Sequence, residues 1–421
     1  MRSLFKTALL CTILFGYCYA KSFLLPVNAS NETKWQNNLA VYWGQNSIEL
    51  DHDDGKHVEY TRLIDICDDP NVDIVIISFV DEFLTVENSF QIHNDDVNHN
   101  NNIAINAISI LRNGFSDDFD YSPQTFGEEI EECKLNEKIV LLSFGGDTGS
   151  YGFDSEEHAI EFADVLYQWF GNHSEVNMSK KPFRNAAING IDLDIENSQY
   201  NNVYYIGFIK RIRENFGPEF LIAGAPQCLY PDENMDVLLT SEEIYFDILF
   251  IQFYNNGYDC NANTNNFNWN TWVDYAANHQ PNKQLKLFMG LPASDGEIAA
   301  ENGYIDDKAL LKDKINFVEE NGGDKWFGGI SLWEASLGYN NYDFGGNYIE
   351  EVKKELLPTS GDVSLGKDNT GEQNESDDDI VHNPRDQTDD KLTSSSSLTK
   401  KNNNNNFLFI FLASFLIHES C

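Results

Sequence analysis

The stretch Asn189-Gly-Ile-Asp-Leu-Asp-Ile-Glu196 alternates apolar and acidic side chains, and it decides the fold that we predict for the chain. Side chains two residues apart on a strand point to the same face of the sheet. Asp192, Asp194 and Glu196 therefore share one face, while the interleaved apolar residues share the other. An acidic ladder on a surface strand is the alternative, but the apolar residues on its other face favour a strand that is buried on both sides.

Eight short apolar runs with strand character follow one another between residues 39 and 357. Most intervals between them have helical patterns, as in residues 156–169, 204–215 and 307–320. Near-continuous apolar strands that alternate with helices are typical of a parallel sheet covered on both faces. Eight such units predict an α/β fold, a (β/α)8 TIM barrel with the three acids inside it. The predicted strands span residues 39–43, 72–79, 138–144, 187–195, 220–225, 246–253, 286–291 and 327–333.

The composition of the chain limits the partners that it can bind. Its 421 residues are 41% hydrophobic, which is enough for a sizeable core, and its formal net charge is -40. Binding to nucleic acid needs clustered Lys and Arg, so we predict that this acidic chain binds no nucleic acid. A neutral polysaccharide is not repelled by the charge, although acidity also serves solubility alone.

Polar residues follow several predicted strands, at the end where the active sites of such barrels lie. Three carboxyls on one face cannot all ionise cheaply, so at least one pKa is raised and the set titrates as a unit. A general acid must be protonated near neutral pH, and Glu196, the outermost of the three, is the candidate. An oxygen-rich cluster also suits magnesium or calcium, but no phosphate-binding loop or His cluster accompanies it in the sequence. We therefore predict no metal and no cofactor.

The same stretch resembles the D-G-x-D-x-D-x-E signature of glycoside hydrolase family 18, with Asn189 in place of the first Asp. Residues 138–146 resemble the S-x-G-G third strand of that family. Three further segments resemble the plant and fungal class III, or hevamine-type, chitinases: residues 40–46, 252–256 and 290–293. The resemblance covers residues 39–357. Because Asn189 is remote from the bond-breaking end, we expect this departure to have little effect on the chemistry.

The resemblance implies an endo-acting chitinase, which hydrolyses β-1,4 linkages between the N-acetylglucosamine units of chitin by a retaining, substrate-assisted mechanism, in the remodelling of a fungal cell wall. It implies that Glu196 is the proton donor, that Asp194 holds the substrate acetamide and that Asp192 shares a proton with Asp194. Tyr254 is expected to hydrogen-bond the acetamide oxygen, with a barrel-filling aromatic as the alternative. The residues expected to contact sugar are Tyr42, Gln45, Asn46, Gly146, Gln252, Asn255 and Trp333.

Two other functions stay open at this point. A non-catalytic chitin-binding or lectin-like relative uses the same barrel but typically lacks the acid at the position of Glu196. An endo-β-N-acetylglucosaminidase that acts on N-glycans shares the acidic signature, whereas the segments at 42–46 and 252–256 favour chitin. The predicted partner is therefore chitin or a chito-oligosaccharide, bound by a monomer.

Both ends of the chain have the pattern of processing signals. Residues 1–20 read as a secretory signal peptide, with an uncleaved anchor as the alternative. Residues 398–421 fit a GPI-attachment signal with Ser395 as the candidate attachment site, and an incidental apolar terminus is the alternative. Between them lie an N-terminal extension, the catalytic barrel and an acidic, Ser-rich stalk predicted to be disordered, at residues 21–38, 39–357 and 358–397.

The sequence also indicates where the protein is found. Secretion agrees with five N-glycosylation triplets, which begin at Asn28, Asn31, Asn172, Asn177 and Asn374. We therefore predict a secreted glycoprotein that a GPI anchor holds at the cell surface, on the membrane or in the cell wall.

Four of the seven cysteines remain if both terminal segments are removed, and four cysteines allow three pairings. Cys67 and Cys133 precede the second and third predicted strands, so both lie near one end of the barrel. Cys228 and Cys260 follow the fifth and sixth strands, near the opposite end. Neighbouring strands favour the pairs Cys67–Cys133 and Cys228–Cys260, with four free buried thiols as the alternative.

Overall fold

The computed structural model describes residues 35–45, 61–83, 123–149, 151–171, 181–197, 199–296 and 299–357. Within these ranges, no helix combines the length and the apolarity that crossing a bilayer requires. The predicted leader, stalk and anchor signal lie outside the described residues. So do several single predicted sites, namely Asn28, Asn31, Asn46, Asn172, Asn177, Asn374 and Ser395.

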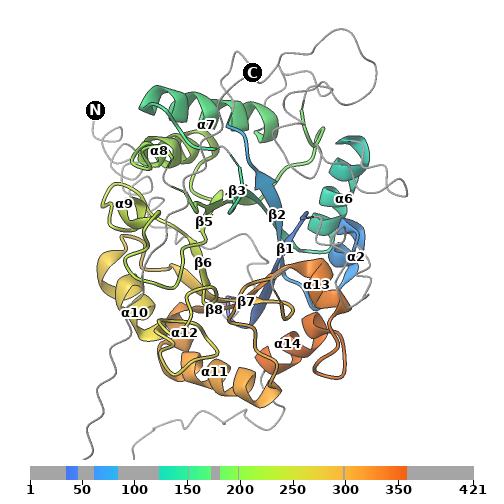
Figure 1. The fold of residues 1–421 in the computed structure, drawn as a ribbon. Coiled ribbons are helices and arrows are strands. Elements are labelled where there is room, and N and C mark those ends of the chain that lie inside the picture. The colour runs from blue at the N-terminus through green and yellow to red at the C-terminus, as the bar shows by residue number, and fades with distance from the viewer. Residues whose placement is uncertain are drawn as a thin grey trace, which may run out of the picture. The chain divides into compact units, whose positions relative to one another are not determined.

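Eight parallel strands close into one barrel, in which each strand pairs with the next along the chain and β8 pairs with β1. Figure 1 shows the strands in the middle with the helices around them. The predicted TIM barrel is confirmed, and each predicted strand overlaps an observed one. The strands are β1 (Asn38–Trp43), β2 (Ile74–Val80), β3 (Ile139–Gly145), β4 (Gly190–Asp194), β5 (Leu221–Gly224), β6 (Ile248–Gln252), β7 (Lys286–Pro292) and β8 (Phe327–Trp333).

Side-chain caps begin two of the long helices that cover the strands. Ser155 Oγ accepts the backbone N–H of His158 at the start of α7, and the Asp307 carboxylate accepts that of Ala309 at the start of α11. Such caps satisfy backbone donors that the first turn leaves open. The three predicted helices are confirmed as α7, α8 and α11. The helical segments are α2 (Leu63–Asp68), α6 (Pro123–Leu135), α7 (Glu156–Phe170), α8 (Tyr204–Phe216), α9 (Asp236–Leu239), α10 (Trp269–Asp274), the π-helix η3 (Tyr275–His279), α11 (Lys308–Glu320), α12 (Gly323–Trp326), α13 (Ala335–Asn340) and α14 (Tyr348–Leu356).

The alternation of side chains along each strand builds two apolar layers. On β1, Leu39, Val41 and Trp43 join a large cluster with residues of the surrounding helices. Ala40 and Tyr42 join a smaller cluster inside the barrel. Both layers remove apolar area from water, which stabilises the fold by roughly 25 cal/mol for each Å2. Burial on both faces is also the reason why the strands read as near-continuous apolar runs.

The strand β4 begins three residues later than predicted, at Gly190. The Asn189 N–H donates to the Val140 carbonyl at 2.8 Å, and the Asn189 Oδ1 accepts the Val140 N–H at 2.9 Å. The side chain therefore takes the place of a backbone carbonyl in the ladder with β3, and regular pairing starts after it. Asn189 thus has a structural role at the opposite end of β4 from Glu196.

Both predicted disulfides are present. Cys67–Cys133 joins α2 to α6, with Cα atoms 4.4 Å apart. Cys228–Cys260 joins the segment after β5 to the segment after β6, with Cα atoms 5.8 Å apart. The paired residues are separated by 66 and 32 positions in the sequence, so each bond restricts the unfolded chain and stabilises the fold.

Candidate active site

The structure brings the three acids of β4 together, as their spacing predicted. Asp192 is 0% exposed and Asp194 is 4% exposed, so both lie inside the barrel. Glu196 is partly exposed just beyond the end of β4. The interleaved Ile191 and Leu193 point away from them, into the apolar cluster that includes the helices. The barrel interior, rather than an outer surface of the sheet, therefore surrounds the acids.

Asp192, the first of the three acids along β4, is held by two hydroxyl groups. Its Oδ2 accepts hydrogen bonds from Ser143 Oγ at 2.7 Å and from Tyr42 OH at 3.1 Å. Its Oδ1 has no hydrogen-bond partner among the described residues. Burial raises the pKa of Asp192 to about 6, against the opposite effect of the two hydroxyls. A buried carboxyl with one open oxygen is suited to share a proton with the next acid on the strand.

The surroundings of Asp194 favour its protonated form. Burial, followed by the charges of Glu196 and Asp192, raises the pKa of Asp194 well above its ordinary value. A hydrogen bond between the Asp194 and Glu196 side chains acts in the same direction on Asp194. Gln252 Nε2 donates to Asp194 Oδ1 at 3.0 Å. The two hydrogen-bonded carboxyls therefore titrate as a unit.

Glu196 has a pKa that suits a general acid. Burial, followed by the charge of Asp147 on the loop after β3, raises the pKa of Glu196 to about 7. Hydrogen bonds with Asp194 and Gln227 lower that pKa in part. Gln227 Nε2 lies 3.2 Å from Glu196 Oε2. A carboxyl with this pKa is protonated in a large fraction of molecules at neutral pH and ionises readily.

A buried hydroxyl holds the backbone of Glu196. Tyr151 OH accepts the Glu196 N–H at 2.9 Å and donates to the Gly146 carbonyl at 2.8 Å. It thereby ties the segment after β4 to the segment after β3. Gly145, with φ of +117°, lets the backbone after β3 lie close to that of Asp194, because a Cβ at this position would lie 2.0 Å from the Asp194 carbonyl oxygen.

A pocket at the C-terminal ends of the strands combines aromatic rings with Asp194. Trp333 stacks on Phe79, with ring centroids 5.7 Å apart, and meets Tyr42 edge to face at 5.6 Å. Tyr254 is buried beside the acids, and burial and then the charge of Asp194 raise its pKa well above the ordinary value. Apolar rings with a few convergent polar groups are typical of ligand sites. The lining residues are Tyr42, Asp194, Phe250, Gln252, Tyr254, Gly290, Ser331 and Trp333.

Two of the predicted sugar contacts, Gln45 and Gly146, have partners within the protein. Gln45 Nε2 donates to the Ser78 carbonyl at 3.2 Å, at the C-terminal part of β2. Gly146 has φ of +95°, and a Cβ there would lie 2.8 Å from the ring of Phe79. The need for glycine at this position therefore comes from the backbone conformation and from Phe79.

Asn255 is not among the residues that line the pocket. It is exposed, and its backbone N–H donates to the Asn302 carbonyl at 3.0 Å. The next residue, Asn256, instead directs its amide to Gln227. The structure therefore separates Asn255 from Gln252 and Tyr254, with which the sequence pattern grouped it.

Sequence reasoning missed several residues that contact the acids. Gln227 lies two positions beyond the predicted end of the fifth strand, so a search of every strand end would have found it. Ser143 lies within the third strand, where its side chain points into the barrel, and it belongs to the S-x-G-G segment. Tyr151 lies in the segment after β3, where no local pattern marks it. Only its contact with the Glu196 backbone shows its importance.

The sequence of the chain is similar to those of known glycosyl hydrolases. Residues 38–305 match the family model described as Glycosyl hydrolases family 18. The chain is 37% identical over 340 residues to "Chitinase 3" of Candida albicans, over 79% of this chain and 53% of that protein. It is 35% identical over 345 residues to "Endochitinase" of Saccharomyces cerevisiae, over 81% of this chain and 54% of that protein. The chain thus spans about half the length of these curated relatives.

A solved structure with the same fold belongs to a protein that is named for a different function. The xylanase and α-amylase inhibitor protein XAIP-II from Scadoxus multiflorus is 28% identical, with a TM-score of 0.52, over 75% of this chain and 97% of that chain. Fold and sequence similarity at this level therefore occur with an enzyme inhibitor as well as with chitinases. The side chains at the site must decide between these functions.

Removal of the Tyr151 hydroxyl is expected to destabilise the fold. In Tyr151→Phe, the Glu196 N–H and the Gly146 carbonyl lose their partner, and an unsatisfied buried group costs about 1–3 kcal/mol. Urea unfolding should show this decrease in the free energy of unfolding. Tyr205→Phe is the matched control, because the buried Tyr205 hydroxyl has no hydrogen-bond partner among the described residues. Equal losses in the two variants would contradict this role of Tyr151.

Proposed function

The chain belongs to glycosyl hydrolases family 18, and on that premise we propose that it is an endo-acting chitinase. The observation that carries the proposal is Glu196, whose pKa is raised to about 7 beside the buried Asp194. The pocket lined by Asp194 and Trp333 offers a place for a sugar. The relatives named as chitinases support chitin as the substrate. The proposed reaction is hydrolysis of β-1,4 linkages between N-acetylglucosamine units, as in the remodelling of a fungal cell wall.

In the first step, Glu196 donates its proton to the glycosidic oxygen while the bond from that oxygen to the anomeric carbon breaks. The carbonyl oxygen of the substrate's own 2-acetamido group bonds to the anomeric carbon, so the substrate supplies the nucleophile. Asp194 holds the acetamide nitrogen, and Tyr254 donates to the acetamide oxygen. The leaving sugar departs as an alcohol, and Glu196 is left ionised.

In the second step, a water molecule bonds to the anomeric carbon and the bond to the acetamide oxygen breaks. Glu196 takes the proton of the water, which restores the acid for the next cycle. Two displacements at the same carbon retain its configuration. A pKa near 7 suits both roles, because the same group must give a proton and then take one at one pH.

The other residues of the site support the charge changes of these steps. No described residue hydrogen-bonds Oδ1 of Asp192, and we assign to Asp192 the proton of Asp194 when Asp194 turns to the acetamide. Trp333, packed on Phe79 and Tyr42, provides a flat apolar surface for the sugar ring. A binding protein needs no acid with a raised pKa, so the three acids favour an enzyme. An N-glycan hydrolase shares the acids, and substrate tests separate it from a chitinase.

Glu196→Gln keeps the size of the side chain but removes the proton donor. We expect hydrolysis of chito-oligosaccharides to fall by at least about 10²-fold, because general acid catalysis contributes about 10²–10⁴-fold. Turnover is measured on chito-oligosaccharides and on N-glycans, and circular dichroism checks the fold. Glu233→Gln, at an exposed position after β5, is the control and should stay active. Undiminished turnover by Glu196→Gln would disprove the assignment, and an inactive wild type on both substrates would favour a binding protein.

The pH dependence of the reaction follows from the pKa of Glu196. Only the protonated form donates, so kcat/KM should fall as the pH rises through about 7. The charge of Asp147 raises this pKa, so Asp147→Asn should lower it and move the alkaline limb of the profile to lower pH. Asp313→Asn, at an exposed position of α11, removes the same charge elsewhere and should leave the limb in place. The prediction is contradicted if the alkaline limb of Asp147→Asn stays at the wild-type pH or moves to higher pH.

We propose further that the protein is secreted and that a GPI anchor holds it at the cell surface. The two disulfides support an oxidising compartment, because such bonds are rare in the cytosol. The leader and the anchor signal rest on the sequence patterns of residues 1–20 and 398–421. Treatment of cells with a phosphoinositide-specific phospholipase should release the protein into the medium. Protein that is found only in the medium before the treatment would count against the anchor.

A further inference from the structure

Gln227, in the segment after β5, contacts the proposed proton donor. Its Nε2 lies 3.2 Å from Glu196 Oε2 and 3.2 Å from Gln252 Oε1. We propose that Gln227 is a positioning residue, which engages Oε2 of Glu196 as a hydrogen-bond acceptor and so leaves Oε1 to carry the proton for the substrate. This inference rests on the proposed function, in which Glu196 is the acid.

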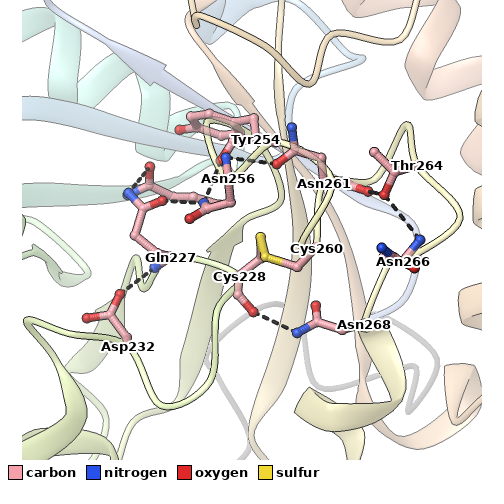
Figure 2. Close-up of a disulfide and its surroundings, with 12 residues drawn as sticks. Gln227, Cys228, Asp232, Tyr254, Asn256, Cys260, Asn261, Thr264, Asn266 and Asn268 are labelled. Atoms are coloured by element: carbon pink, nitrogen blue, oxygen red, sulfur yellow. Dashed lines mark hydrogen bonds between the residues drawn. A yellow bond between two sulfur atoms is a disulfide. The ribbon is translucent and has the colours of Figure 1, made fainter. Parts of the chain in front are cut away.

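A backbone carbonyl determines which atom of Gln227 faces Glu196. Asn256 Nδ2 donates to the Tyr254 carbonyl at 2.7 Å and to Gln227 Oε1 at 2.6 Å, as Figure 2 shows. A backbone carbonyl only accepts, so the Asn256 atom beside it is the NH2 group. The Gln227 atom that faces this NH2 group must then be the oxygen. The NH2 group of Gln227 is therefore turned toward Glu196, which accepts from it.

The other neighbour of Gln227 requires the same orientation. Gln252 Nε2 donates to the Ala225 carbonyl at 3.0 Å, so the oxygen of the Gln252 amide is the atom that faces Gln227. A reversed Gln227 would set its oxygen against oxygens of Glu196 and Gln252, and its NH2 group against that of Asn256. It would lose the hydrogen bonds to all three neighbours. The orientation of the amide is thus determined by groups on both sides of it.

The backbone of Gln227 is clamped as well. Its N–H donates to Asp232 Oδ2 at 2.8 Å, and the next residue forms the disulfide Cys228–Cys260. Figure 2 shows this disulfide beside the Gln227–Asn256 hydrogen bond. Cys260 and Asn256 both lie in the segment after β6, so the disulfide joins the two segments that carry the bonded amides. Gln227 therefore has little freedom to leave Glu196.

This hydrogen bond has two chemical consequences for Glu196. A protonated carboxyl has one O–H donor, and its other oxygen is the better acceptor, so the bond from Gln227 to Oε2 favours Oε1 as the site of the proton, beside the hydrogen bond that Glu196 makes with Asp194. The bond also favours the ionised carboxylate, and it lowers the pKa of Glu196 against the effects of burial and of Asp147. Gln227 thus orients the acid for the first step and stabilises the carboxylate that this step produces.

Two substitutions of Gln227 test this role. Gln227→Leu removes the donor, whereas Gln227→Glu keeps the shape and the acceptor for Asn256 but turns a carboxyl oxygen toward Glu196. A hydrogen bond to an ionised group changes a pKa by about one unit, so the alkaline limb of kcat/KM should move up by about one pH unit in Gln227→Leu. It should move further in Gln227→Glu, where a like charge is added. The kcat at the optimum should fall about tenfold or more in both, because the acid is no longer oriented.

Infrared spectroscopy can follow the protonation of Glu196 as the pH is changed, and it gives the pKa without any turnover. The carboxyl band of Glu196 is identified by its absence in Glu196→Gln. The midpoint of this titration should rise in both Gln227 variants. If the wild type fails to hydrolyse chito-oligosaccharides, the proposed function is wrong, and a raised midpoint still supports the contact of Gln227 with Glu196. The inference is overturned if the wild type is active and folded Gln227→Glu has the same alkaline limb of kcat/KM and the same infrared midpoint as the wild type. Gln227→Glu keeps the bond to Asn256, so it carries the test if Gln227→Leu does not fold.

Asn256→Asp tests the origin of the orientation. An ionised Asp only accepts, so the Gln227 oxygen loses its donor and faces a negative charge, which weakens the restraint on the amide that donates to Glu196. The limb and the infrared midpoint should then rise as in Gln227→Glu. Asn266→Ala is the matched control, because this exposed Asn of the same segment donates to the Tyr258 carbonyl at 2.7 Å and should leave both values unchanged. A wild-type midpoint in Asn256→Asp would contradict the role of Asn256 in orienting Gln227.

Discussion

Three carboxyls, two on β4 and one just beyond its end, lose contact with water and repel one another, and the arrangement of the site follows from this cost. Closure of the barrel removes Asp192 and Asp194 from water, and an isolated buried charge would be very costly. The cost is lowered by raising their pKa values, so that protons replace charges. Glu196, at the mouth of the barrel, keeps a pKa near 7 and is the member of the set that exchanges a proton most readily at neutral pH.

The same constraint explains why other strands of the barrel carry hydroxyls and amides at inward positions. Ser143 and Tyr42 satisfy one oxygen of Asp192, and Gln252 satisfies one oxygen of Asp194. Each of these donors comes from a different strand, so the barrel as a whole, rather than β4, holds the acids. A buried polar network of this kind is stable only when its members have partners. Among the described residues, Oδ1 of Asp192 has no hydrogen-bond partner, which leaves it able to accept the proton that the proposed mechanism assigns to it.

The fold was predictable because its signal is local. A strand buried on both faces is seen in the sequence as an apolar run. The alternation of side chains along β4 was sufficient to place Asp192 and Asp194 on the inner face. The disulfides were also predictable, because neighbouring strands bring their flanking cysteines together. Beyond the end of β6, Tyr254 and Asn256 keep the even spacing from Gln252 and turn to the site, whereas the sequence pattern also grouped the exposed Asn255 with them.

Local sequence was therefore enough for the order of the strands, the inward face of the three acids and the general acid expected at Glu196. It could not supply the hydrogen bonds that tune this acid, because Tyr151, Gln227 and Asn256 come from segments after three different strands. The direction of an amide depends on what its partners can accept, and here a backbone carbonyl sets it. Such information exists only once the barrel has closed and has brought these segments together.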